Sequence, residues 1–291
     1  MENSSDFLQL LGPDVSSNIL SCLDDPADLI RASSVSRSWQ QFVTENCFCK
    51  RLCLKKFPGV SRAIHAIEVN SVILPKSVGS SSDKLLDSVK RNHTVYAILA
   101  RVFSPELRND CISWAIDAST TDNYEVESIQ NTLVPEDFDD FGRYSYWSSK
   151  GIIDDKVPET LTYRLISNLC LVTAINIQPF QAHFQEGSPI YSSKYVKFQI
   201  GCHDSRLTYE SPVFPMSQAN CLQKFELPEP VLCIGGILQI ELSGGVQRQE
   251  SDDLFYICLR YVQVEGRTLL PGFDAQYYFP GQCVISYLSS A

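Results

Sequence analysis

Residues 11–39 read LGPDVSSNILSCLDDPADLIRASSVSRSW, and this stretch decides the fold of the first part of the chain. Its apolar residues recur every three or four positions, as they do on one face of a helix. Pro13 suits the first turn of such a helix, and Pro26, which follows two aspartates, ends that helix and begins the next. The pattern predicts three or four short helices between residues 8 and 57.

Polar residues are placed to cap the second and third of these helices. Asp25 precedes the helix that begins at Pro26, and Ser36 precedes a helix whose apolar stripe contains Trp39 and Val43. A module of about fifty residues buries too little apolar surface to be comfortably stable alone. Its apolar residues therefore either contact a partner protein or pack as a helical cap on the rest of the chain, and periodicity does not decide between these alternatives.

The order of the residues resembles the F-box family. In that family a Leu-Pro pair opens the first helix, an Ile-Leu-x-x-Leu motif follows, and a Leu-x-x-x-x-x-Val-x-x-x-Trp run closes the motif. The chain matches this pattern at Ile19, Leu20, Leu23, Leu29, Val35 and Trp39. It departs from the pattern by placing Gly12 between Leu11 and Pro13, which still leaves Pro13 at the start of a helix.

The resemblance implies docking to a Skp-family adaptor, which would join the chain to a cullin-based ubiquitin ligase as a non-catalytic substrate receptor. The implied adaptor-binding residues are Leu11, Pro13, Ile19, Leu20, Leu23, Leu29, Val35 and Trp39. Trp39 either contacts the adaptor or supports the helices from inside, and we favour internal support. The alternative function is a carbohydrate- or glycoprotein-binding module, with the helical segment as a structural cap.

A connector is predicted between the helical module and a second domain. Pro58-Gly59, Pro75 and the serine-rich tract at 77–82 are typical of exposed loops, and a helical pattern follows over 84–101. The predicted organisation is an F-box helical module at 1–57, a linker and connecting helix at 58–101, and a target-binding β domain at 102–291.

From about residue 111 the apolar period changes toward two. Every second residue of 196–200 and of 238–242 is apolar, which predicts half-buried strands, and longer apolar runs at 169–177 and 254–264 fit central strands. The number and spacing of these segments predict an antiparallel β-sandwich or jelly roll. The whole chain is then an α+β multidomain protein.

A second resemblance rests on the succession of segments 115–120, 145–151, 159–165 and 172–180, which resembles a discoidin or galactose-binding-like β-sandwich. Loops on a rigid sandwich are where recognition usually resides. The candidate target-binding residues are Tyr144, Tyr146, Trp147 and Lys150, because aromatic side chains beside a cation suit a protein or sugar surface. Trp147 is equally suited to the core.

The net charge of −10 lies almost entirely in residues 102–160, which hold 13 acidic and 4 basic residues. Acidity argues against non-specific binding to nucleic acid, which needs a basic face. The acidic stretch could steer a basic partner toward one surface, although a solvated, loop-rich region is the simpler interpretation. Without a long apolar run or a positively charged leader, the sequence predicts no membrane partner and a location in the cytosol, the nucleus or both.

No catalytic, cofactor or metal motif is expected in the chain. The sequence holds no Walker, H-E-x-x-H or G-x-S-x-G pattern. Cys47, Cys49 and Cys53 lack C-x-x-C spacing, which disfavours zinc, and the carboxylates between 137 and 155 lack the spacing of a calcium loop. Most of the eleven cysteines stand in apolar strings, as reduced core thiols do.

Overall fold

The structure is a computed structural model, and it describes residues 6–56, 66–68, 89–90, 93, 95–99, 109–202, 206–269, 273–278 and 282–287. The chain divides into two compact units. One comprises Met1–Glu106 together with Leu269–Ala291, and the other comprises Leu107–Thr268. Among the described residues, no helix has both the length and the apolar character needed to cross a membrane.

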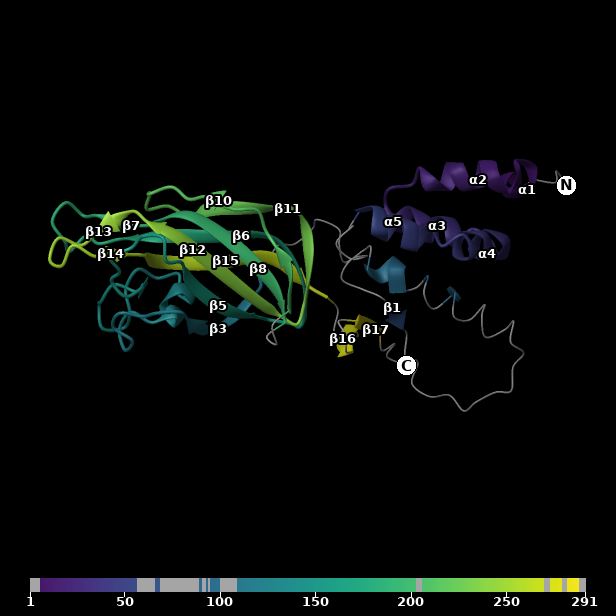
Figure 1. Cartoon of the computed structure of the whole chain (residues 1–291). Coiled ribbons are helices and arrows are strands. Elements are labelled where there is room, and N and C mark those ends of the chain that lie inside the picture. Colours follow the sequence, from purple (N-terminus) through teal and green to yellow (C-terminus); the bar gives the residue numbers. More distant parts are fainter. Residues whose placement is uncertain are drawn as a thin grey trace. The chain divides into compact units, whose positions relative to one another are not determined.

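Five short helices form residues 7–56 (Figure 1): α1 (Phe7–Leu10), α2 (Gly12–Ser21), α3 (Pro26–Ser33), α4 (Arg37–Glu45) and α5 (Phe48–Lys56). Both predicted caps are present, since the side chain of Asp25 accepts a hydrogen bond from the backbone of Ala27 and that of Ser36 accepts one from Trp39. The sequence predicted three or four helices, and the structure has five between residues 7 and 56, with the last part of the module divided between α4 and α5. Cys47 lies between them with a φ of 51°, a conformation that an α-helix does not accommodate.

The connecting helix predicted at 84–101 falls only partly on described residues. Residues 89–90, 93 and 95–99 are helical, and Val95 and Leu99 are fully buried. The serine-rich tract at 77–82 lies outside the described residues.

A small sheet in the first unit joins distant parts of the chain. It contains β1 (Ala66–Glu68), β16 (Phe273–Tyr278) and β17 (Gln282–Tyr287). Ala66 pairs in parallel with Val284, so the last strands associate with residues 66–68 instead of extending the two large sheets of the second unit.

The second unit is a β-sandwich whose strand pairs are all antiparallel in the described residues, which confirms the predicted fold. The first sheet has the order β10 (Phe214–Pro215), β8 (Ser193–Cys202), β12 (Ile237–Gly245), β5 (Glu159–Leu165) and β3 (Ile112–Ala118), with β9 (Arg206–Glu210) beside β8. The second has the order β11 (Gln223–Ile234), β6 (Leu169–Gln181), β15 (Cys258–Thr268) and β2 (Asn109–Asp110), with β4 (Trp147–Ser148) on β15 and β7 (Ile190–Tyr191) on β6.

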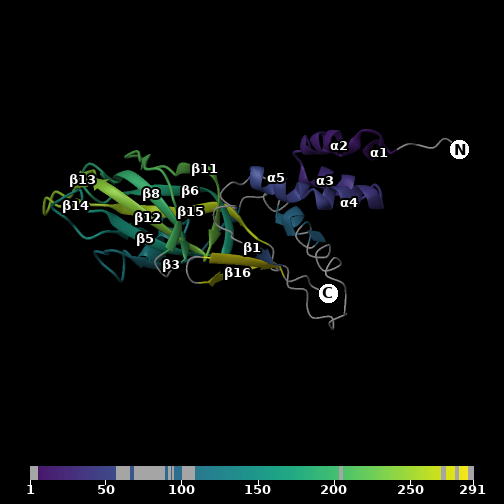
Figure 2. The same cartoon turned by 45° about the vertical axis from the view of Figure 1, so that its right-hand side comes forward.

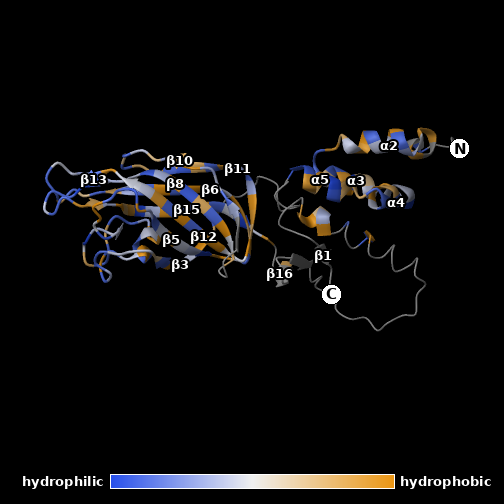
Figure 3. Cartoon of the chain, viewed as in Figure 1, coloured by the Kyte–Doolittle hydropathy of each residue, from blue (hydrophilic) through white to orange (hydrophobic). Residues whose placement is uncertain are grey.

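The core of the sandwich lies between these two sheets, whose long strands run along its length (Figure 2). Phe198 and Ile240 come from the first sheet, and Ile175 and Val264 from the second; all four are fully buried. Alternation of apolar and polar residues along the strands, visible in Figure 3, puts one face of each strand into this core. The strands predicted from the pattern at 196–200 and 238–242 are confirmed as β8 and β12.

Candidate functional site

One side of α2 is apolar and open to solvent. Leu11, which precedes the helix, and Val15 and Ile19 within it are spaced by four residues and are 45, 47 and 43% exposed. Side chains four apart lie above one another on the same side of a helix, so the three form one continuous apolar row. An exposed apolar row is a feature of surfaces that contact another protein.

The other side of α2 faces its own unit. Leu20 is 3% exposed and Leu29 of α3 only 1%, so these two predicted adaptor-binding residues support α2 from within. With Leu23, Phe48 and Leu52 they line a cavity of about 340 Å³. The helix is therefore held by one face while the row defined above stays free in the described structure.

The remaining predicted docking residues differ in their surroundings. Pro13 is exposed and Val35 is 62% exposed, whereas Leu23 and Trp39 are half-buried. The indole Nε1 of Trp39 donates a hydrogen bond to Oδ1 of Asp6 at 2.8 Å. Because Asp6 immediately precedes α1, this hydrogen bond ties α4 to the start of the helical module.

An aromatic cluster lies at one end of the sandwich, where β7, β13 (Gln247–Arg248) and β14 (Phe255–Tyr256) are labelled in Figure 1. Phe180, Tyr191 and Tyr256 are buried there, and Tyr144 and Tyr146 pack against them. The rings of Tyr146 and Phe180 are stacked, with centroids 3.9 Å apart and planes at 6°. Two of the predicted target-binding residues thus belong to one cluster.

A cavity of about 170 Å³ lies beside this cluster. We call it the loop-end cavity; it is lined by Asp122, Glu127, Tyr146, Ser148, Phe180, Ala182, Phe184, Gln185, Tyr191, Gln249, Tyr256 and Cys258. The hydroxyl of Tyr146 donates a hydrogen bond to Oε1 of Glu127 at 2.6 Å. The second oxygen of Glu127, Oε2, is buried and has no hydrogen-bond partner.

Burial shifts the pKa values of the polar groups in this cavity. Desolvation raises the pKa of Glu127 above its ordinary value. The hydrogen bond from Tyr146 opposes this rise, the carboxylate of Asp122 adds to it, and a backbone hydrogen bond from Asn123 opposes it. Desolvation and the contact with Glu127 raise the pKa of the Tyr146 hydroxyl, which therefore stays protonated and remains a donor.

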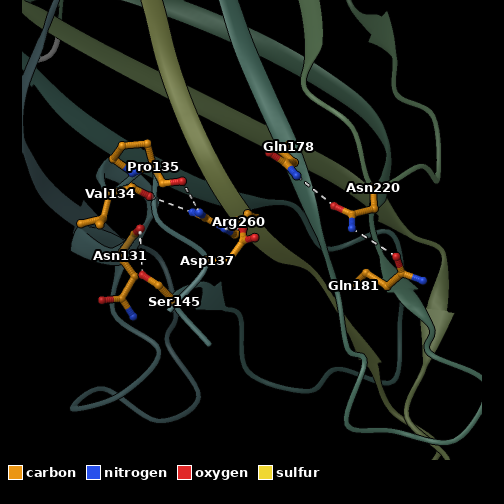
Figure 4. Close-up of polar contacts among 9 residues, drawn as sticks. All are labelled: Asn131, Val134, Pro135, Asp137, Ser145, Gln178, Gln181, Asn220 and Arg260. Atoms are coloured by element: carbon orange, nitrogen blue, oxygen red, sulfur yellow. Dashed lines mark hydrogen bonds and ion pairs between the residues drawn. The ribbon is translucent and has the colours of Figure 1, made fainter. Parts of the chain in front are cut away.

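A buried arginine anchors the segment that leads to Tyr144 and Tyr146 (Figure 4). Arg260 of β15 is 5% exposed, and its guanidinium donates to the carbonyl oxygens of Val134 and Pro135 at 2.7 and 2.5 Å and to Oδ1 of Asp137 at 2.9 Å. Three charge-assisted hydrogen bonds from one rigid group fix the loop against the sheet. The anchor limits movement of the loop where it approaches the aromatic cluster.

Side-chain amides join β6 to the neighbouring loop at 216–222 (Figure 4). Gln178 donates to Oδ1 of Asn220 at 2.9 Å, and Asn220 donates to Oε1 of Gln181 at 3.1 Å. Asn131 in turn donates to the carbonyl oxygen of Tyr146 at 2.9 Å. Side-chain amides thus tie the loop at 216–222 to β6, and Asn131 to the backbone of Tyr146.

The other two predicted target-binding residues lie elsewhere. Trp147 has no exposed surface and belongs to the sandwich core, where its Nε1 donates to the carbonyl oxygen of Thr120 at 3.2 Å. Because the ring of Trp147 has no exposed surface, it cannot contact a partner protein, and it is not among the proposed target contacts. Lys150 is exposed and does not line the loop-end cavity.

The cysteines carry no metal site in the part of the chain that the structure describes, where no group of three or more His, Cys, Asp or Glu is placed to hold an ion. The ten cysteines whose side chains are described are free thiols. Burial raises the pKa of Cys49 and of Cys53 to about 12, so these two are protonated at neutral pH.

Comparisons with known proteins show the family of the chain. A family model described as F-box-like matches residues 10–55. An F-box protein of Arabidopsis thaliana is 46% identical over 298 residues, covering 93% of this chain and 78% of the relative.

Solved structures similar to this chain include carbohydrate-binding modules. The family 32 module of Streptococcus pneumoniae EndoD has a TM-score of 0.40 at 11% identity, over 54% of this chain and 98% of that chain. A CBM32 module of a family 31 glycoside hydrolase from Clostridium perfringens has a TM-score of 0.39 at 11% identity, over 53% of this chain and 90% of that chain. With scores this low, the fold assignment rests on the strand topology described above.

Proposed function

Because the chain belongs to the F-box protein family, we propose that it is the substrate-recognition subunit of a Skp–cullin–F-box ubiquitin ligase. The helical module docks to a Skp-family adaptor and through it to a cullin. The β-sandwich holds the target protein.

The exposed apolar row of Leu11, Val15 and Ile19 is the observation that most supports docking. It lies within the matched residues 10–55, and its helix is fixed from behind by the buried Leu20. Protein interfaces concentrate their binding energy in a few apolar side chains that become fully desolvated. A rigid helix that presents three such side chains loses little conformational entropy on binding.

The chain itself performs no bond chemistry in this proposal. Holding the target beside the ligase replaces a bimolecular encounter by a nearly intramolecular one, and the effective concentration of the acceptor lysine rises accordingly. In this proposal residues 1–57 bind the adaptor, residues 58–101 form a linker and connecting helix, and the sandwich within residues 102–291 binds the target. We place this activity in the cytosol, the nucleus or both, and it needs no cofactor, nucleic acid or membrane.

Co-elution of purified proteins tests the proposal. The full chain is mixed with a Skp-family adaptor and its cullin, and the mixture is separated by size-exclusion chromatography. The wild-type chain should elute with both partners, and a folded Leu11→Asp/Ile19→Asp variant should elute alone. Elution of the folded wild-type chain apart from the adaptor would refute the docking role.

A further inference from the structure

The loop-end cavity contains two carboxylates that lack a cation. Asp122 and Glu127 line it, and neither forms an ion pair with any Lys, Arg or His that the structure describes. Other carboxylates of the sandwich do have such partners: Asp155 pairs with Lys194 and Asp137 with Arg260. Asp122 and Glu127 therefore line the same cavity with no described cation to neutralise them.

Glu127 has one hydrogen-bonding oxygen to spare. Its Oε1 accepts the bond from Tyr146, while Oε2 is buried with no partner. A buried polar atom without a partner costs free energy, because its hydration is lost and nothing replaces it. A donor entering the cavity would restore that bond, and a positively charged donor would also neutralise the carboxylate.

Aromatic rings surround the carboxylates. Phe180, Phe184, Tyr146, Tyr191 and Tyr256 all line the cavity, and the last two lie edge to face with centroids 6.4 Å apart. Ring faces attract cations, most strongly where water is excluded. Phe184 is 58% exposed and Asp122 is exposed, so the cavity reaches the surface.

The size of the cavity limits what can enter. Its volume of about 170 Å³ is below the roughly 300–1,000 Å³ of sites that hold drug-sized ligands. A single side chain fits this volume better than an oligosaccharide does. The net charge of −9 over residues 102–160, which include Asp122 and Glu127, would speed the approach of a basic segment.

We propose that the loop-end cavity receives one cationic side chain, a guanidinium or an ammonium, from the protein that the sandwich holds. The positive group pairs with Glu127 and Asp122, and its methylene stem lies against the rings. This inference rests on the proposed function, since it names the chemistry by which the target is recognised.

Nuclear magnetic resonance of the full chain labelled with ¹³C in its alanine methyl groups tests the proposal. The methyl group of Ala182 lines the cavity, and its signal is identified by its loss in Ala182→Gly. The probes are acetyl-Gly-Gly-X-Gly-Gly-amide peptides in which X is arginine, lysine or citrulline, together with free galactose. Citrulline keeps the shape of arginine and lacks its charge.

The signal of Ala182 should shift with the arginine peptide, the lysine peptide or both, and not with the citrulline peptide. Glu127→Gln should weaken binding of the cationic peptide by about tenfold or more, since it removes a charge-assisted bond. Glu125→Gln makes an equal change of charge at an exposed position of the same segment. Its affinity for the cationic peptide should stay within about twofold of the wild-type affinity, because exposed charges contribute little.

Three results would overturn the proposal: equal shifts with citrulline and arginine, a response to galactose alone, or unchanged binding in Glu127→Gln. Co-elution with the adaptor, measured on the same protein sample, distinguishes failure of the cavity proposal from failure of the ligase proposal. A chain that binds the adaptor and no cationic peptide refutes the cavity proposal alone. A chain that binds the peptide through Glu127 and no adaptor refutes the ligase role and leaves the cation site standing.

Discussion

The hydroxyl of Tyr146 donates a hydrogen bond to Oε1 of Glu127, at a distance of 2.6 Å. The ring of Tyr146 is itself held by its stack on Phe180, which belongs to β6. One carboxylate is thus oriented by a tyrosine that the sheet fixes, and its other oxygen is left available at the loop-end cavity.

The stability of the sandwich should depend on pH through Glu127. Burial and Asp122 raise the pKa of Glu127 in the folded protein above its unfolded value, so the folded state holds this proton more firmly. The stability that Glu127 contributes is full below its unfolded pKa and is lost as the pH rises through its folded pKa. Relative to Glu127→Gln, which does not titrate, the wild type should become less stable as the pH rises across that window.

Urea denaturation of both proteins at a series of pH values measures this difference. The same carboxylate must be ionised to bind a cation, so binding of the arginine peptide should strengthen over the window in which stability falls. A difference in stability that is constant with pH, or that favours the wild type at higher pH, would show that Glu127 is not buried as described.

Removal of the guanidinium of Arg260 should loosen the loop that it anchors. Arg260→Met leaves the carbonyl oxygens of Val134 and Pro135 without their donor, and loss of hydrogen bonds to a charged group should cost about 2–3 kcal/mol of unfolding free energy. Arg143→Met is the control, because Arg143 forms an exposed pair with Asp139 that is worth about 0.5 kcal/mol or less. Equal losses in the two variants, measured by denaturant unfolding, would contradict the anchoring role.

Alanine substitutions at Trp147 and Lys150 should differ strongly in their effect on the free energy of unfolding. Trp147→Ala opens a cavity in the core and should cost about 3–5 kcal/mol, whereas Lys150→Ala should change stability by about 0.5 kcal/mol or less. Thermal or denaturant unfolding of the full chain measures both. A Trp147→Ala variant as stable as the wild type would place this ring at the surface and restore it as a candidate contact.

The helical module and the long strands were predictable because their signals are local. Asp25 and Ser36 cap helices in the structure as their positions in the sequence indicated, and the alternation in 196–200 marked β8. The break between α4 and α5 had no comparable signal. Cys47 adopts a left-handed backbone conformation. Glycine or asparagine at this position would have indicated that conformation, whereas cysteine does not.

The loop-end cavity could be predicted only in part. The sequence pointed to Tyr146, which lines the cavity, and to Tyr144, which belongs to the neighbouring aromatic cluster. Glu127 and the segment that carries Phe180 and Phe184 lie far from Tyr146 in the sequence or carry no pattern of their own, and only the folded topology brings them together. Glu127 also stands within an acidic stretch, where its sequence context indicated a solvated loop.

The burial of Trp147 follows from the alternation of side chains along an extended segment. In an extended segment, successive side chains point to opposite faces, so Tyr144 and Tyr146 share one side, and Ser145 and Trp147 share the other. The structure follows this alternation, since Ser145 and Trp147 are buried while the two tyrosines are half-buried.

Pairing of residues 66–68 with 284–286 shows a different limit. These strands are more than 200 residues apart in the sequence, and neither carries a pattern that identifies the strand with which it pairs. Long-range pairing of this kind depends on the whole fold.

Isothermal titration calorimetry of the full chain with a purified Skp-family adaptor tests the central claim most directly. The wild type should bind, and Ile19→Asp should weaken binding by about 2 kcal/mol or more, roughly thirtyfold, because a charge replaces an apolar residue of the exposed row. Ser21→Asp adds the same charge to α2 at an exposed position two residues away, on a different side of the helix, and its adaptor affinity should stay within about twofold of the wild type. Equal affinity of the wild type and a folded Ile19→Asp variant would contradict the account.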